Sequence, residues 1–319
     1  MSQKVAIIVW AWWQDGTILT KLLLARWYGV IAVHRSHTIY VGIDQWRTDI
    51  DILVAEDANY LIQKFSPTQL YYLAAYHHSS QEVTPDDTVL FQKSREVHVD
   101  WYLNFLSAIA RYSPETRVCY ASSCLIYEGS TTQVQNEDTL PVPNSPYGIT
   151  KLEGMHVGNW YMKKHSLHIL NAILYNHESE FRWQKFLSMK VILGAIAISQ
   201  GKQKELILWD LSTKIDQGSA WDYMENMISL LEGDKTWDYI FSSGEQHTIQ
   251  DMVEIVFGHL GLDWKEYVKV DTGIIQRRTG TLFWDNTKLK DDIRWNVTIW
   301  FEEMLKKIIS ISKSEAFTL

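Results

Sequence analysis

Tyr147 and Lys151 stand at the two ends of the run Tyr-Gly-Ile-Thr-Lys, four residues apart. On a helix, residues with this spacing share one face. A lysine ammonium beside a phenol favours the phenolate, so the spacing predicts a lowered pKa for Tyr147 and a role in acid/base chemistry. The chain contains 16 tyrosines, however, and such a pair also arises by chance, so it needs supporting context.

Part of that context lies upstream, in the segment Ala121-Ser-Ser-Cys-Leu-Ile-Tyr127. The segment follows an apolar run that is typical of a strand, and its two serines predict a hydroxyl-rich turn at the strand end. We therefore expect Ser123, Tyr147 and Lys151 to converge at the carboxyl edge of a sheet.

The elements that must position these residues alternate between short β-branched runs and helical stretches. This pattern is typical of a parallel sheet covered by helices on both faces. The expected strands are residues 5–9, 30–33, 69–73, 117–121 and 168–174. The expected helices are residues 17–28, 56–65, 91–111 and 145–165. The last of these begins with Ser-Pro, and proline is well tolerated there because its missing N–H has no helical partner anyway.

From residue 176 onward the connecting segments are longer, and helices are expected near 186–200, 220–231, 248–260 and 300–311. The predicted fold class is α/β, with a Rossmann-type doubly wound parallel sheet in residues 1–175. A smaller, mainly helical lobe is expected in residues 176–319, with segments near 206–243 returning to the first domain.

Composition excludes several function classes. The formal net charge of −8 and the pI near 5.8 argue against nucleic acid as the main partner, since phosphate binding requires a basic surface. The two cysteines, Cys119 and Cys124, are too few for a disulfide framework and favour a reducing compartment. No apolar run approaches the roughly 18 residues of a membrane helix. We expect a cytoplasmic protein with no membrane partner and no metal site.

Three further motifs occur in a fixed order. Gln14-Asp-Gly16 opens the first expected helix, Leu73-Ala-Ala75 ends the third expected strand, and Asn176-His-Glu-Ser179 follows the last one. Together with the serine, tyrosine and lysine described above, these motifs resemble those of the extended short-chain dehydrogenase/reductases. They are most similar to the GDP-mannose 4,6-dehydratases. The resemblance extends over roughly residues 4–310.

The resemblance implies roles for individual residues. Ser123 and Tyr147 would hydrogen-bond to the C4 oxygen of a sugar, and Lys151 would also reach the cofactor ribose. Residues 1–175 would bind a dinucleotide, and the smaller lobe would bind the substrate. The implied cofactor-binding residues are Gln14, Asp15, Gly16, Arg35, Asp51, Leu73, Ala74, Ala75, Tyr147 and Lys151. The implied substrate-binding residues are Asn176, Arg182, Lys190 and Arg277.

The choice of cofactor depends on the end of the second expected strand. An acidic residue there suits the 2′-hydroxyl of NAD, whereas an arginine suits the 2′-phosphate of NADP, so Arg35 favours NADP. The resemblance also implies a nucleotide-diphosphate sugar such as GDP-mannose as substrate, and a homo-oligomeric assembly. In the family reaction, Tyr147 would take the C4 hydroxyl proton while NADP⁺ takes hydride. Water would then leave across C5–C6, and hydride would return to C6.

The chain departs from the family at its glycines. The family has glycine where this chain has Trp10 and Trp13, and only the third glycine of the loop, Gly16, is present. The first two glycines allow a tight turn and a close approach of the pyrophosphate to the helix N-terminus, so two indoles would obstruct it. The same exchange recurs at Trp27, Trp101, Trp209 and Trp284. Tryptophan and glycine codons can differ by one base.

A second departure concerns elimination. In the family, a glutamate two residues after the catalytic Ser or Thr removes the C5 proton, and here that position is Leu125, which cannot accept a proton. An arginine expected to contact the diphosphate is Ile215. The leading interpretation is therefore a nucleotide-sugar 4,6-dehydratase by resemblance. The alternatives are a nucleotide-sugar 4-reductase or epimerase, and a catalytically inactive scaffold of the same fold.

Overall fold

The computed structural model describes residues 3–34, 37–44, 47–77, 85–132, 134–233, 235–274, 284–293 and 297–315. Its main feature is a seven-stranded sheet in the order β11-β6-β5-β4-β1-β2-β3. The strands are β1 (Val5–Val9), β2 (Gly29–Val33), β3 (Thr38–Val41), β4 (Gln69–Tyr72), β5 (Arg117–Ser123), β6 (Ile169–Leu174) and β11 (Trp237–Phe241). Neighbouring strands run parallel except at the β2–β3 edge. The fold is thus a Rossmann-like α/β fold, as predicted.

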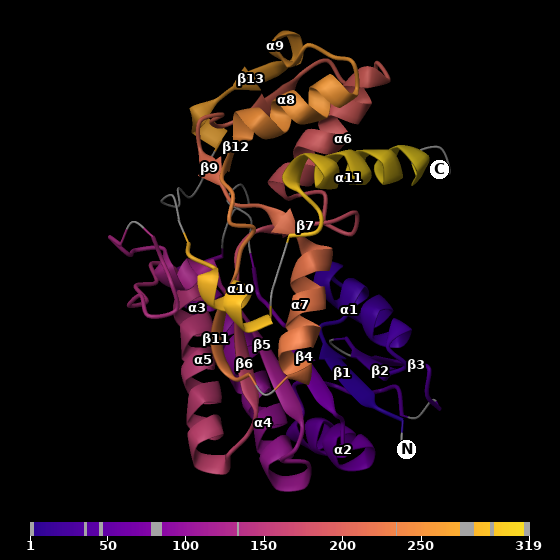
Figure 1. Cartoon of the computed structure of the whole chain (residues 1–319), viewed down its shortest axis with the longest axis vertical. Coiled ribbons are helices and arrows are strands. Elements are labelled where there is room, and N and C mark those ends of the chain that lie inside the picture. Colours follow the sequence, from indigo (N-terminus) through magenta and orange to yellow (C-terminus); the bar gives the residue numbers. More distant parts are fainter. Residues whose placement is uncertain are drawn as a thin grey trace.

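Helices cover both faces of this sheet (Figure 1). On one face, α2 (Ala55–Phe65), α4 (Trp101–Tyr112) and α5 (Pro146–His165) enclose the first hydrophobic core. On the other face, α1 (Gln14–Ala25) and α7 (Ala220–Glu232) pack together over the second core. Strands with apolar side chains on both faces are required for this arrangement, and β1, β2 and β6 are buried almost throughout.

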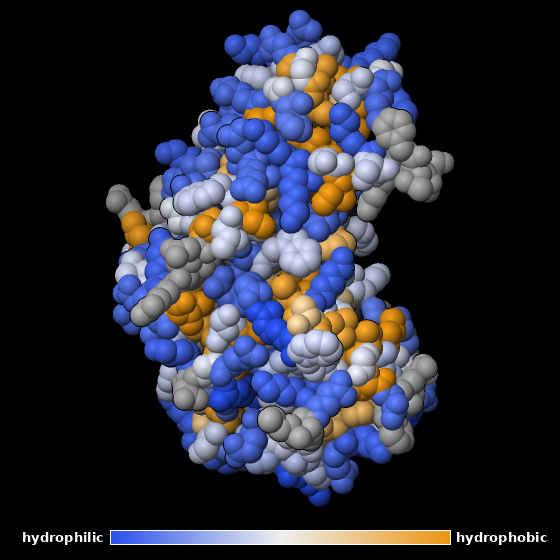
Figure 2. Space-filling model, turned by 45° about the vertical axis from the view of Figure 1, so that its right-hand side comes forward, coloured by the Kyte–Doolittle hydropathy of each residue, from blue (hydrophilic) through white to orange (hydrophobic). Residues whose placement is uncertain are grey.

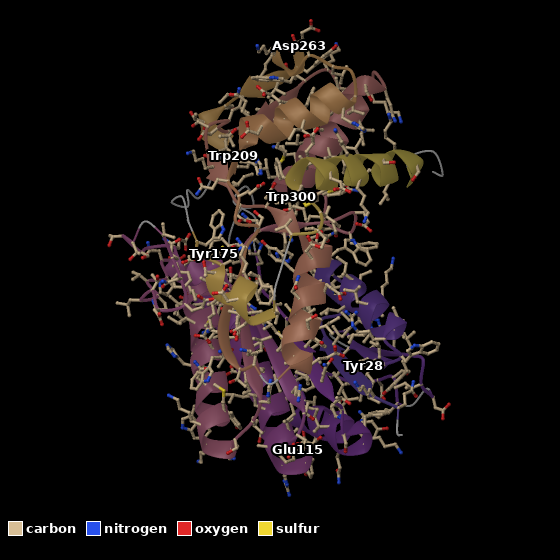
Figure 3. The ribbon with its side chains drawn as sticks, in the orientation of Figure 1. Tyr28, Glu115, Tyr175, Trp209, Asp263 and Trp300 are labelled. Carbon is tan, nitrogen blue, oxygen red and sulfur yellow. The ribbon has the colours of Figure 1, made fainter. Side chains whose placement is uncertain are left out.

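A smaller lobe stands above the carboxyl ends of the strands (Figure 1). Its own core is enclosed by α6 (Leu187–Ser199), α8 (Ile249–His259) and α11 (Phe301–Glu315). The remaining elements are β7 (His177–Glu178), β8 (Leu206–Leu208), β9 (Lys214–Ile215), β10 (Gly218–Ser219), β12 (His247–Thr248), β13 (Val268–Val270), α9 (Trp264–Tyr267), α10 (Thr287–Ile293) and a 3₁₀ turn at Thr272–Ile274. In Figure 3, Tyr175, just after β6, faces this lobe, whereas Glu115, just before β5, lies at the opposite end of the molecule.

Polar side chains cover most of the face seen in Figure 2, and apolar side chains reach the surface in short patches near the junction of the lobes. In the described part of the chain, no helix has the length and apolar character needed to cross a membrane. Ligands of doubly wound sheets bind outside the carboxyl ends of the strands, at the point where the strand order reverses. Here that point lies between β1 and β4, directly below the smaller lobe.

The helical stretch predicted for residues 91–111 is present, but it is not a regular α-helix throughout. The structure has α3 (Asp87–Arg95), a π-helical turn at Glu96–Asp100 and then α4. The carbonyl oxygens of Val97 and His98 in this turn accept hydrogen bonds from the hydroxyls of Tyr72 on β4 (2.5 Å) and Tyr120 on β5 (3.1 Å). Because the two tyrosine hydroxyls satisfy these carbonyl oxygens, the turn does not need regular helical hydrogen bonds there. Single π turns are frequent at functional sites.

Candidate active site

The start of α5 positions Tyr147 and Lys151. The Ser145 hydroxyl caps the helix by accepting a hydrogen bond from the N–H of Gly148 (3.3 Å), and Pro146 occupies the first turn. Tyr147 and Lys151 therefore lie on one face of α5, as their spacing predicts, and this face contacts β5.

Lys151 is buried beneath the carboxyl edge of the sheet. Its ammonium donates to the carbonyl oxygens of Ala121 (2.7 Å), near the end of β5, and Ala74 (3.1 Å), just after β4. Burial lowers the pKa of Lys151 to about 7. The lysine thus joins the ends of two central strands while its charge is sensitive to pH near neutrality.

Tyr147 lies within hydrogen-bonding reach of the Ser123 side chain. The prediction that its pKa is lowered is wrong for this structure. Burial raises the pKa of the phenol, Cys124 adds to this, and the hydrogen bond from Ser123 offsets only a part. The Lys151 ammonium does not produce the predicted lowering of this pKa, because it binds two carbonyl oxygens and lies 5.8 Å from the centre of the Tyr147 ring.

Two histidines that were not among the predicted site residues surround the Tyr147 ring. The rings of His98 and His77 lie 5.0 and 5.2 Å from it, each in an edge-to-face arrangement. His98 is fully buried, and burial lowers its pKa well below the usual range, so the ring is neutral. Its Nε2 accepts the N–H of Tyr76 (3.0 Å), which leaves the proton on Nδ1 to donate to the Thr150 hydroxyl (2.7 Å). His98 therefore connects the β4 loop to α5.

The Gln14-Asp-Gly16 and Asn176-His-Glu-Ser179 motifs bind each other. The Gln14 amide donates to the carbonyl oxygen of His177 (3.0 Å) and accepts from the Ser179 hydroxyl (2.9 Å). The Asp15 carboxylate pairs with the His177 ring (3.0 Å). Burial alone would raise the pKa of Asp15 and lower that of His177, but their attraction reverses both shifts. These side chains hold the smaller lobe to the start of α1.

The other predicted residues are distributed around this junction. The Arg182 guanidinium pairs with Glu178 (3.3 Å) and lies 3.7 Å from the centre of the Phe186 ring. Asn176 is exposed, and burial lowers the pKa of Lys190 on α6. The Asp51 carboxylate accepts the N–H of Leu53 (2.9 Å) in the turn before α2. Arg35 and Arg277 lie outside the described residues.

The loop from Trp10 to Gly16 is the place where a dinucleotide pyrophosphate would bind. Gly16 has no room for a side chain, since a Cβ there would lie 2.4 Å from the carbonyl oxygen of Ala11. Trp10 takes a left-handed backbone conformation with φ 72°, and its ring lies 6.1 Å from that of Trp101. The Trp13 ring packs edge-to-face on Trp183 of the smaller lobe, at 4.8 Å. Two indoles thus occupy the path to the N-terminus of α1, and the chain with these side chains does not fit a dinucleotide.

Leu125 lies in the 3₁₀ turn Cys124–Tyr127, directly after β5. Its N–H donates to the Ser123 hydroxyl oxygen (3.3 Å), so the residue is held beside the catalytic candidates. Glu128, the nearest carboxylate in sequence, accepts from the Ser145 hydroxyl at the α5 cap (2.9 Å). The turn therefore places an alkyl side chain where the family has a general base.

Comparison with known proteins agrees with this geometry. A model of the family described as GDP-mannose 4,6 dehydratase matches residues 13–308. This chain belongs to the GDP-mannose 4,6-dehydratase family. GDP-mannose 4,6 dehydratase 2 of Arabidopsis thaliana is 29% identical over 327 residues, covering 96% of this chain and 86% of the relative. GDP-mannose 4,6-dehydratase of Sinorhizobium fredii is 30% identical over 276 residues, covering 82% and 78%.

Solved structures share the family fold at lower identity. A putative epimerase from Burkholderia cenocepacia superposes with a TM-score of 0.81 at 17% identity, covering 98% of this chain and 99% of that structure. A dTDP-glucose 4,6-dehydratase from Bacillus anthracis, solved in complex with NAD, gives a TM-score of 0.78 at 16% identity, covering 98% and 97%. GDP-mannose 4,6-dehydratase family membership and the α/β fold are thus established independently.

Proposed function

We propose that this chain is a nucleotide-sugar-modifying protein of the GDP-mannose 4,6-dehydratase type, in which Tyr147 exchanges a proton with the C4 hydroxyl of the sugar. The observation that supports the proposal is the meeting of Ser123, Tyr147 and Lys151 at the carboxyl edge of the sheet, below the smaller lobe. The substrate would be a nucleotide-diphosphate sugar such as GDP-mannose. Family resemblance supports a homo-oligomeric assembly, and Arg35 supports NADP as the cofactor of a chain with glycine in place of Trp10 and Trp13.

The three side chains have separable tasks. The Ser123 hydroxyl lies beside the phenol and would share the C4 oxygen with it. Tyr147 begins as the neutral phenol because burial raises its pKa. The ammonium form of Lys151, favoured below about pH 7, is held by two carbonyl oxygens and would add positive charge near the phenolate. We therefore expect proton acceptance by Tyr147 to depend on the protonation of Lys151.

Recognition of the diphosphate is assigned to the smaller lobe. Arg182 and Lys190 flank the start of α6, and burial holds Lys190 with a lowered pKa, which an anionic ligand would reverse. Arg182 pairs with Glu178, whose second interaction is a hydrogen bond from the Ser188 hydroxyl (2.5 Å). The arginine is thus held in place by a fixed carboxylate before any ligand binds.

Two observations support narrower alternatives. Leu125 leaves elimination across C5–C6 without a base, which favours a 4-reductase or epimerase that acts only at C4. Trp10 and Trp13 obstruct the dinucleotide path, which favours an inactive scaffold for the chain with these side chains. Proton exchange at C4 by Tyr147 uses neither Leu125 nor the loop of Trp10 and Trp13, so both alternatives retain the proposed sugar-nucleotide site.

Calorimetric titration with GDP-mannose tests the proposed site without requiring turnover. We expect Lys190→Ala to weaken binding about tenfold, the effect of losing one charged contact. Lys202→Ala, at an exposed lysine just beyond the same helix, is the matched control and should bind like the parent. Equal affinities for the parent and Lys190→Ala, or no binding of GDP-mannose by the parent, would contradict the proposal.

A further inference from the structure

The backbone takes glycine-like conformations at several tryptophans. Among the residues that the structure describes, five non-glycine residues have positive φ, and three of them are tryptophans: Trp10 (72°), Trp27 (63°) and Trp237 (80°). Tryptophan supplies only 15 of the 319 residues, so this share is far above its abundance. A left-handed backbone is unfavourable for any residue with a Cβ, and it is a clear outlier for a bulky one.

Trp27 shows the mismatch most clearly, because it stands directly after the C-cap of α1. The N–H of Tyr28 donates to the carbonyl oxygen of Leu23 (3.0 Å), and the N–H of Trp27 donates to that of Leu24 (3.0 Å). These two hydrogen bonds form the Schellman motif, in which the residue at the position of Trp27 is usually glycine. The indole is 87% exposed, so its own burial contributes almost nothing to offset the strain.

Several indoles also lack the partners that tryptophan normally finds. The ring N–H groups of Trp10, Trp13 and Trp284 are buried and have no hydrogen-bond acceptor among the described residues. A buried indole N–H usually has one, and leaving it unpaired is costly. Six tryptophans are instead exposed over about half of their surface or more, although this residue type is highly buried on average: Trp12, Trp27, Trp160, Trp183, Trp237 and Trp300.

We infer that this backbone evolved with glycine at positions 10, 27 and 237, and that the cell that makes the protein inserts glycine there by decoding UGA codons as glycine. UGA differs from the glycine codon GGA only in its first base, and its meaning differs between genetic codes. A tryptophan at these positions then results from reading UGA under another code. The inference concerns the covalent identity of the chain and does not depend on the proposed function.

A ligand that stacks on tryptophan does not account for the same observations. Trp12, Trp13 and Trp183 do form an aromatic surface at the crevice, with ring centres 5.9 and 4.8 Å apart. Trp27, however, lies between α1 and β2, and Trp237 begins β11, so both stand in elements away from this surface. Glycine explains the backbone at all three positive-φ positions, whereas ligand stacking concerns only the crevice.

Glycine at positions 10 and 13 would remove the two indoles that obstruct the approach of a dinucleotide pyrophosphate to α1. The family has glycine at both positions, and Gly16 already has the close approach to Ala11 that the third glycine of such a loop provides. The N–H groups at the start of α1 would then be open to an anion.

The codons and the peptides of the protein purified from its own cells test this inference. We expect UGA at codons 10, 27 and 237, and glycine at these positions in peptides analysed by mass spectrometry. Trp264, whose side chain packs on the core of the smaller lobe, is the internal reference and should be read as tryptophan from UGG. UGG codons at the three positions, or tryptophan in the peptides that contain them, would overturn the inference.

Recombinant variants provide a second measurement. Trp27→Gly should raise the midpoint of thermal unfolding by about 2 °C, because the strain is relieved and little burial is lost. Trp160→Gly, at a half-exposed tryptophan inside α5, is the matched control and should lower the midpoint, since glycine disfavours a regular helix. A midpoint that falls in Trp27→Gly as it does in Trp160→Gly would contradict a glycine position there.

Discussion

The beginning of α5 and the loop before α1 meet at the same edge of the sheet, yet they differ in how well side chains and backbone agree. At α5, Ser145 caps the helix, Lys151 binds two carbonyl oxygens, and both ring nitrogens of His98 have partners. In the loop, Trp10 has a strained backbone, and the ring N–H groups of Trp10 and Trp13 are buried without acceptors. Buried polar groups are satisfied where sequence and fold evolved together. The contrast indicates that the side chains at the start of α5 are those with which this backbone evolved, whereas Trp10 and Trp13 in the loop are not.

The largest expected effect tests whether a general base at position 125 is the only catalytic group that the site beside α5 lacks for dehydration. In a chain with Trp10→Gly and Trp13→Gly, we expect Leu125→Glu to raise formation of the 4-keto-6-deoxy sugar about a hundred- to ten-thousand-fold, the usual contribution of a general base. The measurement is NMR product analysis after incubation with GDP-mannose and NADP⁺. Tyr147→Phe in the same background is the control and should abolish the reaction. Efficient product formation with Leu125 in place would show that another residue removes the C5 proton.

The next effect concerns the loop itself. Trp10→Gly combined with Trp13→Gly should tighten NADPH binding by about a hundredfold, or ~2.7 kcal/mol, because the indoles no longer occupy the phosphate path. Fluorescence titration with NADPH and NADH measures this effect. Trp300→Gly, at an exposed tryptophan at the start of α11, is the matched control and should leave affinity unchanged. Micromolar binding of NADPH by the parent chain would show that Trp10 and Trp13 do not obstruct the site.

A smaller effect tests whether the α5 side depends on its buried polar network. His98→Phe should lower the free energy of unfolding by about 2 kcal/mol, because the half-buried N–H of Tyr76 loses its acceptor. Ser94→Ala, one turn away, removes a buried hydroxyl that has no hydrogen-bond partner among the described residues. This control substitution should leave the free energy of unfolding unchanged or raise it slightly. Urea unfolding compares the two variants, and equal losses of stability would deny His98 a specific role.

The smallest effect concerns the ion pair that joins the start of α1, just after the loop, to β7. His177 has a pKa above its usual 6.5, so its charge stabilises the fold fully below that pH and loses this effect as pH rises through the raised pKa. Asp15 has a pKa below 3.8, so its contribution is present above that value and is lost only in stronger acid. Asp15→Asn should therefore cost about 1 kcal/mol of unfolding free energy near pH 6, and less near pH 9. A loss independent of pH would show that the pair acts only as a neutral hydrogen bond.

The sequence by itself determined much of the frame. Apolar runs predicted β1 with its observed bounds and most other central strands within one or two residues, because a strand buried on both faces must be apolar throughout. Ser145 and Pro146 predicted the start of α5, since helix caps are local interactions. The antiparallel edge strand β3 and the π turn were not foreseen. Both depend on neighbours distant in sequence, namely β2 for the strand, and Tyr72 and Tyr120 for the turn.

Only the tertiary structure decided the state of the site. The pKa of Tyr147 is raised because burial disfavours the phenolate, and the Lys151 ammonium is held instead by carbonyl oxygens of β5 and of the loop after β4. The mutual binding of Gln14 and His177 joins segments 163 residues apart. The left-handed backbone at Trp10 likewise depends on the fold, because its N–H donates to the carbonyl oxygen of Val33 at the end of β2 (2.8 Å). Residue types and their spacing reveal which groups are available, but burial and backbone conformation, which decide how those groups behave, exist only once the chain has folded.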